Sequence, residues 1–149
     1  MTISDKHSEK ILNLIYDAAA EEELWSSVLT EIADLTRSQG GILFGQSLAA
    51  SRVYFDYNGR LDEECNRAYQ HRHMQNAWSE RMEHQPVGRV VFSDDVIELS
   101  ALRATAFFDE VLRPQDVAHN SMIPLAAKED FRAAFNICRT SRQGPFGVD

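Results

Sequence analysis

Four residues that could bind a metal ion lie close together in the middle of the sequence: Cys65, His71, His73 and His84. The residues around them predict a helix, and side chains two positions apart on a helix point in nearly opposite directions. His71 and His73 therefore cannot face the same ion. The sequence contains no C-x-x-C or H-x-x-x-H pattern that would compensate. We predict a solvated helix face here and no metal site.

Groups that could catalyse a reaction are no better arranged. Cys138 lies in a predicted strand and is expected to behave as a small buried hydrophobe. No serine sits in a G-x-S-x-G elbow, and Gly40-Gly41 precedes a strand, whereas a phosphate cradle opens a helix. We therefore predict that the chain is not an enzyme and has no catalytic residues. One alternative is a small α+β enzyme with an isomerase-like cone, in which Asp56 would be the buried acid.

Aromatic residues are frequent in the middle of the chain, on the predicted strands and on the helices that should cover them. They fill a core efficiently because each one buries a large area. Some of them could instead line an apolar cavity between the sheet and its helices, the usual form of a small-molecule pocket. The candidates for such a lining are Phe44, Tyr57, Tyr69, His73, Trp78, Phe108 and Phe135.

Elements that must position these side chains follow from the hydrophobic periodicity. A period of 3.6 residues predicts helices over 8–20, 24–35, 61–74 and 102–112, while 75–85 is ambiguous. Alternation and short apolar runs predict five strands over 42–45, 51–57, 89–92, 119–127 and 131–140. Short turns join the first two of these strands to each other and the last two to each other. The layout is therefore α+β: an antiparallel sheet of about five strands covered by helices, after two N-terminal helices.

Composition and charge limit the classes of protein that fit. The 149 residues are enough for one domain, 1–149, and the hydrophobic share of 44% is ordinary for a globular chain. The net charge of −8 opposes broad contact with nucleic acid. The N-terminus has no signal-peptide pattern, no apolar run is long enough to span a membrane, and the two cysteines fit reduced thiols. We expect a cytoplasmic protein.

Several segments, taken in order, resemble the N-terminal sensor domains of LuxR-type bacterial transcriptional regulators. They are residues 14–19 (LIYDAA), 24–29 (LWSSVL), 40–44 (GGILF), 86–91 (PVGRVV), 105–114 (TAFFDEVLRP) and 144–146 (GPF). The resemblance implies a PAS/GAF-like fold that helps the regulator to dimerise and binds a small effector. It also implies that a helix-turn-helix domain, which alone would contact DNA, follows residue 149, and that a long helix beginning after Phe146 leads to it.

The resemblance leaves the ligand open. Lactone-binding members of the family use a Trp-x-x-x-Tyr pair, whereas this chain has Tyr69-x-x-x-His73 followed by Trp78, which argues against a lactone. A haem would need His73 as its axial ligand, and we expect no cofactor. The predicted homodimer surface is the helical stripe Ile11, Leu14, Ile15 and Ala18, unless that stripe packs within its own domain. A domain that only dimerises, without a ligand, is the other alternative.

Overall fold

A computed structural model describes residues 3–147, so the first two and last two residues of the predicted 1–149 domain lie outside the described residues. Its centre is one sheet of five antiparallel strands in the order β2-β1-β5-β4-β3. The strands are β1 (Gly40–Ser47), β2 (Arg52–Gly59), β3 (Val91–Phe92), β4 (His119–Lys128) and β5 (Phe131–Arg139). The predicted α+β fold, with its five-stranded antiparallel sheet, is confirmed.

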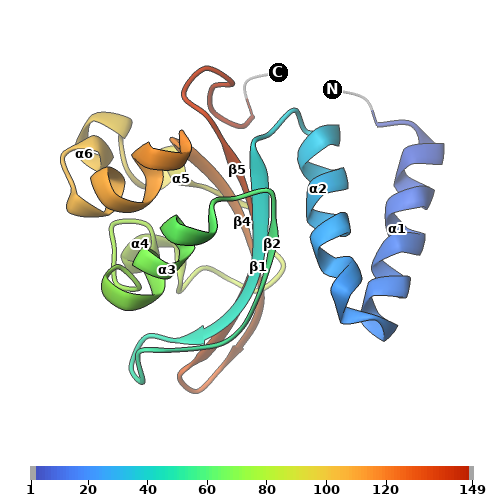
Figure 1. The fold of residues 1–149 in the computed structure, drawn as a ribbon, viewed down its shortest axis with the longest axis horizontal. Helices are drawn as coiled ribbons and strands as arrows, with labels where there is room; N and C mark the ends of the chain where they lie inside the picture. The colour runs from blue at the N-terminus through green and yellow to red at the C-terminus, as the bar shows by residue number, and fades with distance from the viewer. Residues whose placement is uncertain (1–2, 148–149) are drawn as a thin grey trace.

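Two N-terminal helices cover one face of the sheet in successive layers (Figure 1). Helix α1 (Asp5–Ala20) is capped by the Ser4 side chain, which accepts a hydrogen bond from the backbone N–H of His7. After the short helix η1 (Glu22–Leu24), helix α2 (Trp25–Leu35) packs directly on β1, β2 and β5, while α1 packs on the outer side of α2. Glycine permits this close approach, because a Cβ on Gly59 would lie 2.5 Å from Leu29 Cβ.

Shorter helices cover the opposite face and bury the main hydrophobic core (Figure 1). Their bounds are α3 (Glu63–Arg72), α4 (Ser79–Met82), α5 (Ser93–Val96), α6 (Leu99–Arg103), η2 (Phe108–Leu112, wound as a π-helix) and η3 (Arg113–Gln115). The continuous helix predicted over 102–112 is wrong. Thr105 interrupts it, because its hydroxyl donates to the carbonyl of Leu102 and accepts from the N–H of Phe108, which ends one helix and caps the next.

The last described segment, residues 141–147, folds back in turns. The ring of Phe146 stacks on the ring of Phe92, with 6.2 Å between centroids. The Arg139 guanidinium also lies over the Phe146 ring, 4.5 Å from its centroid. Arg139 is 5% exposed and also donates to the carbonyls of Pro145 and Thr36. The C-terminal segment is therefore fastened to β5.

Within residues 3–147, none of the helices has the length and apolar character needed to cross a membrane.

Candidate ligand-binding pocket

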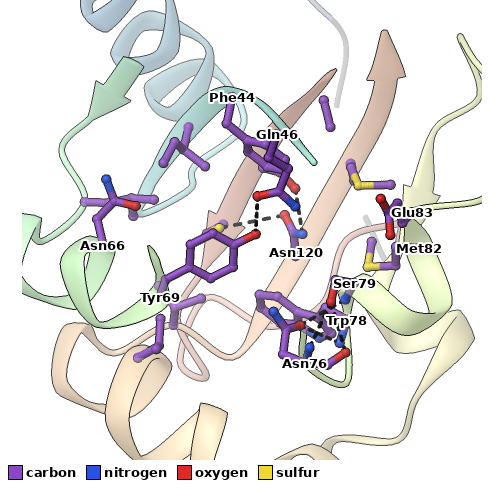
Figure 2. Close-up of a pocket in the computed structure, with 18 of the residues that line it drawn as sticks. Phe44, Gln46, Asn66, Tyr69, Asn76, Trp78, Ser79, Met82, Glu83 and Asn120 are labelled. Atoms are coloured by element: carbon purple, nitrogen blue, oxygen red, sulfur yellow. Dashed lines mark hydrogen bonds between the residues drawn. The ribbon is translucent and has the colours of Figure 1, made fainter. Parts of the chain in front are cut away.

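A pocket lies between the sheet and the layer formed by α3, α4 and η2 (Figure 2). Its cavity volume is about 130 Å³ for the centres of water-sized molecules. A single buried water needs roughly 10–15 Å³ on this measure, so the space can hold an organic molecule. Most of the lining is apolar, as in typical small-molecule sites.

The sheet supplies one wall of the pocket through the alternation of side chains along each strand. On β1 the alternating residues Ile42, Phe44 and Gln46 face the pocket, and on β5 and β4 Asn136 and Asn120 do so. Asn120 and Asn136 lie on neighbouring strands and are both 5% exposed. Two amides are thus buried in the sheet wall among apolar neighbours.

The opposite wall depends on a turn that one side chain holds in place. Both donors and the acceptor of the Asn76 amide bind backbone groups: Nδ2 donates to His73 and Met74, and Oδ1 accepts from Trp78 and Ser79. This local closure starts α4 and fixes the backbone of Trp78. The Trp78 ring then packs edge-on against Phe107, with 5.5 Å between centroids.

Hydrogen bonds in the pocket form two short chains (Figure 2). The Cys138 thiol donates to Asn120 Oδ1 at 3.7 Å, and Asn120 Nδ2 donates to Asn136 Oδ1 at 2.9 Å. The Tyr69 hydroxyl donates to Gln46 Oε1 at 2.6 Å. Burial raises the pKa of the Tyr69 phenol and raises the pKa of the Cys138 thiol to about 12. Both groups therefore stay protonated and neutral at neutral pH.

Charged residues that line the pocket belong to elements at its ends: Asp62, Glu83 and Arg132. The Asp62 carboxylate caps α3 by accepting from the N–H of Cys65, and this hydrogen bond lowers the pKa of Asp62. Burial raises the pKa of Glu83, although His84 and Arg132 act in the opposite direction. The Arg132 Nη1 donates to the carbonyls of Glu129 and Phe131.

Three of the seven aromatic and histidine candidates line this pocket: Phe44, Tyr69 and Trp78. Tyr57 lies on the other face of the sheet, where it packs against Trp25 and donates to Glu22. Phe135 lies between Ala134 and Asn136, which line the pocket, so strand alternation turns it to the other face. Neither side chain lines the pocket, because the sequence does not tell which face of a strand carries the cavity.

The other two candidates lie on the pocket side of the sheet but do not line the pocket. His73 Nε2 lies 2.5 Å from Glu110 Oε2 and its ring packs near Phe107. The hydrogen bond from His73 is the main reason why the pKa of Glu110 is lowered. Phe108 belongs to the hydrophobic core, and the Arg113 guanidinium lies over its ring. His73 is thus engaged in a surface pair, and an axial role toward a haem in the pocket is not supported.

Sequence reasoning missed the amides. Gln46, Asn120 and Asn136 sit in strands whose other pocket-lining residues are apolar, apart from Arg132 at the start of β5. Asparagine is depleted in strands and rarely buried without a partner, so Asn120 and Asn136 in predicted interior strands were a detectable signal. Their pairing was not, since it depends on the β4–β5 register that places Asn120 next to Cys138 and Met122 next to Asn136.

The other predicted groups have different environments. Ile11, Leu14 and Ile15 are half-buried and Ala18 is 1% exposed on α1, whose neighbour is α2, so this stripe packs within the domain. The Asp56 carboxylate accepts from Asn66 and Gln70 of α3 and does not line the pocket. Among residues 3–147, no group of three or more His, Cys, Asp or Glu side chains could hold a metal ion.

Comparison with known proteins places the fold. No protein-family model matches the sequence, and no curated protein sequence matches it. Among solved structures, the chain is similar to the crystal structure of the VqsR LBD domain from Pseudomonas aeruginosa, with a TM-score of 0.70. The two are 10% identical in sequence, and the match covers 94% of this chain and 82% of that chain. The chain shares the fold of this regulator domain over nearly all of its length.

Proposed function

We propose that this chain is the sensor domain of a LuxR-type transcriptional regulator and that it binds a small effector in the pocket between the sheet and α3, α4 and η2. The observation that carries the proposal is a largely apolar cavity of about 130 Å³ inside a domain that shares the fold of the VqsR LBD domain. VqsR is a LuxR-type regulator, and LBD denotes its ligand-binding domain. The proposed role is regulatory and not catalytic.

The path from the pocket to the C-terminal segment supports a switching role. Asn136 and Cys138 line the pocket on β5, and the next residue, Arg139, holds Pro145 and Phe146. A ligand that prefers one position of β5 would therefore also bias the position of the C-terminal segment. In the proposed regulator, that segment leads toward a DNA-binding domain, since the acidic sensor itself has a net charge of −8 and is unsuited to phosphate contacts.

Further parts of the proposal concern the whole regulator. We propose that residues 1–149 form a single PAS/GAF-like domain of a cytoplasmic bacterial homodimer, with no resident cofactor. An effector that binds the folded domain stabilises it by an amount that grows with the logarithm of the effector concentration over the dissociation constant.

A thermal-shift screen of small apolar and amphipathic molecules tests the proposal in three proteins. Ala126 lines the pocket, whereas its neighbour Ala127 on β4 is exposed and does not line it. Ala126→Phe should fill part of the cavity and abolish the stabilisation that a bound molecule gives to the wild type. Ala127→Phe is the matched control and should keep it. If no molecule stabilises the wild type, or if Ala126→Phe responds like Ala127→Phe, the pocket is not the effector site and a dimerisation-only domain becomes the better interpretation.

A further inference from the structure

Residues 141–147, called here the C-terminal strap, fold back at the end of the sheet after β5 (Figure 1). The backbone N–H of Gly144 donates to the carbonyl of Thr140 at 3.2 Å. Residues 145–147 make no backbone-to-backbone hydrogen bond with any part of residues 3–147, so side-chain contacts alone hold them in place. Segments with so few backbone hydrogen bonds open locally at a low cost in free energy, without unfolding the domain.

A buried charge lies beneath the strap. Three buried donors have no hydrogen-bond partner within residues 3–147: Trp78 Nε1, Asn136 Nδ2 and Arg139 Nε. Arg139 is the charged one, and it is 5% exposed. No ion pair among residues 3–147 includes it. A buried cation without a carboxylate partner is costly unless other groups direct negative partial charge toward it. The groups around Arg139 therefore decide whether this charge stays buried.

Those groups come from α2 and from the strap. Arg139 Nη2 donates at 2.6 Å to the carbonyl of Thr36, at the C-terminal end of α2, where the helix dipole is negative. Nη1 donates to the carbonyl of Pro145 at 3.0 Å, and the guanidinium lies 4.5 Å from the centroid of the Phe146 ring. The face of an aromatic ring attracts a cation. Two of these three compensating groups thus belong to the strap.

Phe146 also joins the strap to a second strand. Its ring stacks on the ring of Phe92 in the edge strand β3, with 12° between the ring planes. Phe146 is half-buried, whereas Pro145 and Gly147 on either side of it are exposed. Phe146 is therefore the side chain that anchors the strap, through Arg139 on β5 and Phe92 on β3.

The direction of the strap depends on the backbone of Gly144. Its φ is +82°, in the left-handed region that side chains with a Cβ adopt only with strain. A Cβ added at Gly144 would meet no heavy atom within 4 Å. The fold-back therefore uses the conformational freedom of this glycine and not close packing around it, which is the property of a hinge.

We propose that the C-terminal strap has two positions, closed and open, that Gly144 is its hinge, and that the contacts of Phe146 with Arg139 and Phe92 hold it closed. Closing gains these contacts but removes water from the guanidinium, so the two positions have opposing advantages. Opening exposes Arg139 and Phe92 while Thr36 still accepts from the guanidinium. The strap needs no effector. Where the proposed function holds, Asn136 and Cys138 on the same strand allow the effector to bias its position.

The position of the strap can be measured by ¹⁹F NMR of the chain with 4-fluorophenylalanine at position 146. In the closed position, the ring current of Phe92 shifts the resonance away from its position in the urea-unfolded chain. Phe92→Leu checks this assignment and should remove most of the shift. A wild-type resonance already at the unfolded position would mean that the closed position is not populated, and would overturn the proposal.

Gly144→Ala tests the hinge. It should raise the ratio of open to closed strap about ten-fold, as expected for one alanine strained in the left-handed region, and move the resonance toward the unfolded position. Gly147→Ala is the matched control. Gly147 has nearly the same φ, +81°, but it follows Phe146, so the resonance should stay in place. A Gly144→Ala resonance at the wild-type position, or equal shifts in the two variants, would overturn the hinge.

Arg139→Lys tests the latch. It keeps the charge but loses the planar fork that reaches two carbonyls, and it should also open the strap. An unchanged resonance would overturn the role of Arg139. Circular dichroism checks that the domain stays folded, and if Arg139→Lys unfolds, Gly144→Ala still decides the question.

The proposed function is tested separately by the thermal-shift screen. If no molecule stabilises the domain but Gly144→Ala opens the strap, the effector role fails and the strap is supported. If a molecule binds the pocket and the ¹⁹F resonance does not move, the coupling between pocket and strap is overturned.

Discussion

Glu83, a half-buried residue of the pocket lining, makes the stability of the domain depend on pH. Burial raises the pKa of Glu83 above the value of about 4.3 that a glutamate has in an unfolded chain. The folded state therefore binds more protons than the unfolded state between these two pKa values. In that window, stability contributed by this group falls as the pH rises and is recovered as the pH falls toward the unfolded value.

Glu83→Gln is accordingly expected to stabilise the domain at pH 7 and to give no advantage at about pH 4, below the unfolded pKa. Urea unfolding of the variant and the wild type at several pH values between these limits measures the difference. Glu80→Gln in α4 is the control, since Glu80 is exposed and its effect should be small. A constant difference between Glu83→Gln and the wild type at every pH would contradict the assignment.

At the residue scale, the sequence indicates which types of side chain could line a pocket, but not on which face of the sheet each one lies. Phe44, Tyr69 and Trp78 were identified as polar or aromatic candidates, and they meet in the pocket. Tyr57 and Phe135 were not separable from them, because residue type carries no information about which side of a strand is hollow. The unpaired donors of Trp78 and Asn136 could not be predicted at all, because an unpaired atom is defined only once every neighbour is placed.

Helix α2 packs close to the backbone of the sheet because β1 and β2 have glycines where they meet it. A Cβ on Gly59 would lie 2.5 Å from Leu29 Cβ and 3.1 Å from the backbone nitrogen of Thr30. The second atom belongs to the helix backbone, so relief would require α2 itself to move away from β2. Tightly packed interiors resist such shifts.

Gly59→Ala should therefore lower the free energy of unfolding by about 3 kcal/mol, the upper end of the range for overpacked sites. Gly88→Ala is the control. Gly88 has a φ of +84° and no heavy atom within 4 Å of its added Cβ, so it isolates the backbone cost of the left-handed conformation, roughly 1–2 kcal/mol. Urea unfolding compares the two variants. A loss at Gly59 no larger than the loss at Gly88 would mean that α2 adjusts freely.

At the element scale, periodicity predicted the strands well, because both long hairpins have alternating or continuous apolar patterns bounded by turn residues. It failed where a local hydrogen bond competes with the pattern. Thr105 breaks the predicted helix over 102–112, and Asn76 closes the turn that made 75–85 ambiguous. Side chains that bind their own backbone interrupt helices without changing the hydrophobic period, so the pattern alone does not reveal them.

The molecule as a whole exposes two large side chains of its outermost helix, α1. The stripe that faces α2 leaves Leu12 and Tyr16 on a neighbouring side of the helix, 55% and 75% exposed. Exposed apolar residues one turn apart on an outermost helix form a stripe that a second copy of the same helix can cover. We therefore propose this stripe of α1 as the homodimer surface, in place of Ile11, Leu14, Ile15 and Ala18. Each copy carries a net charge of −8, so added salt should strengthen the association by screening the repulsion.

Leu12→Glu/Tyr16→Glu is expected to convert the dimer into a monomer, because it replaces apolar contacts with four carboxylates on facing helices. Sedimentation velocity over a range of protein and salt concentrations measures the change, and circular dichroism checks that the helices persist. Ala101→Glu/Ala106→Glu adds the same charge at two exposed alanines in the opposite helical layer and should leave the dimer intact. A wild type that remains monomeric at all concentrations, or a Leu12→Glu/Tyr16→Glu variant that still dimerises, would exclude this surface. In the second case the dimer must form elsewhere, and the exposed aromatic side chains of the edge strand β2, Tyr54 and Phe55, would be the next surface to alter.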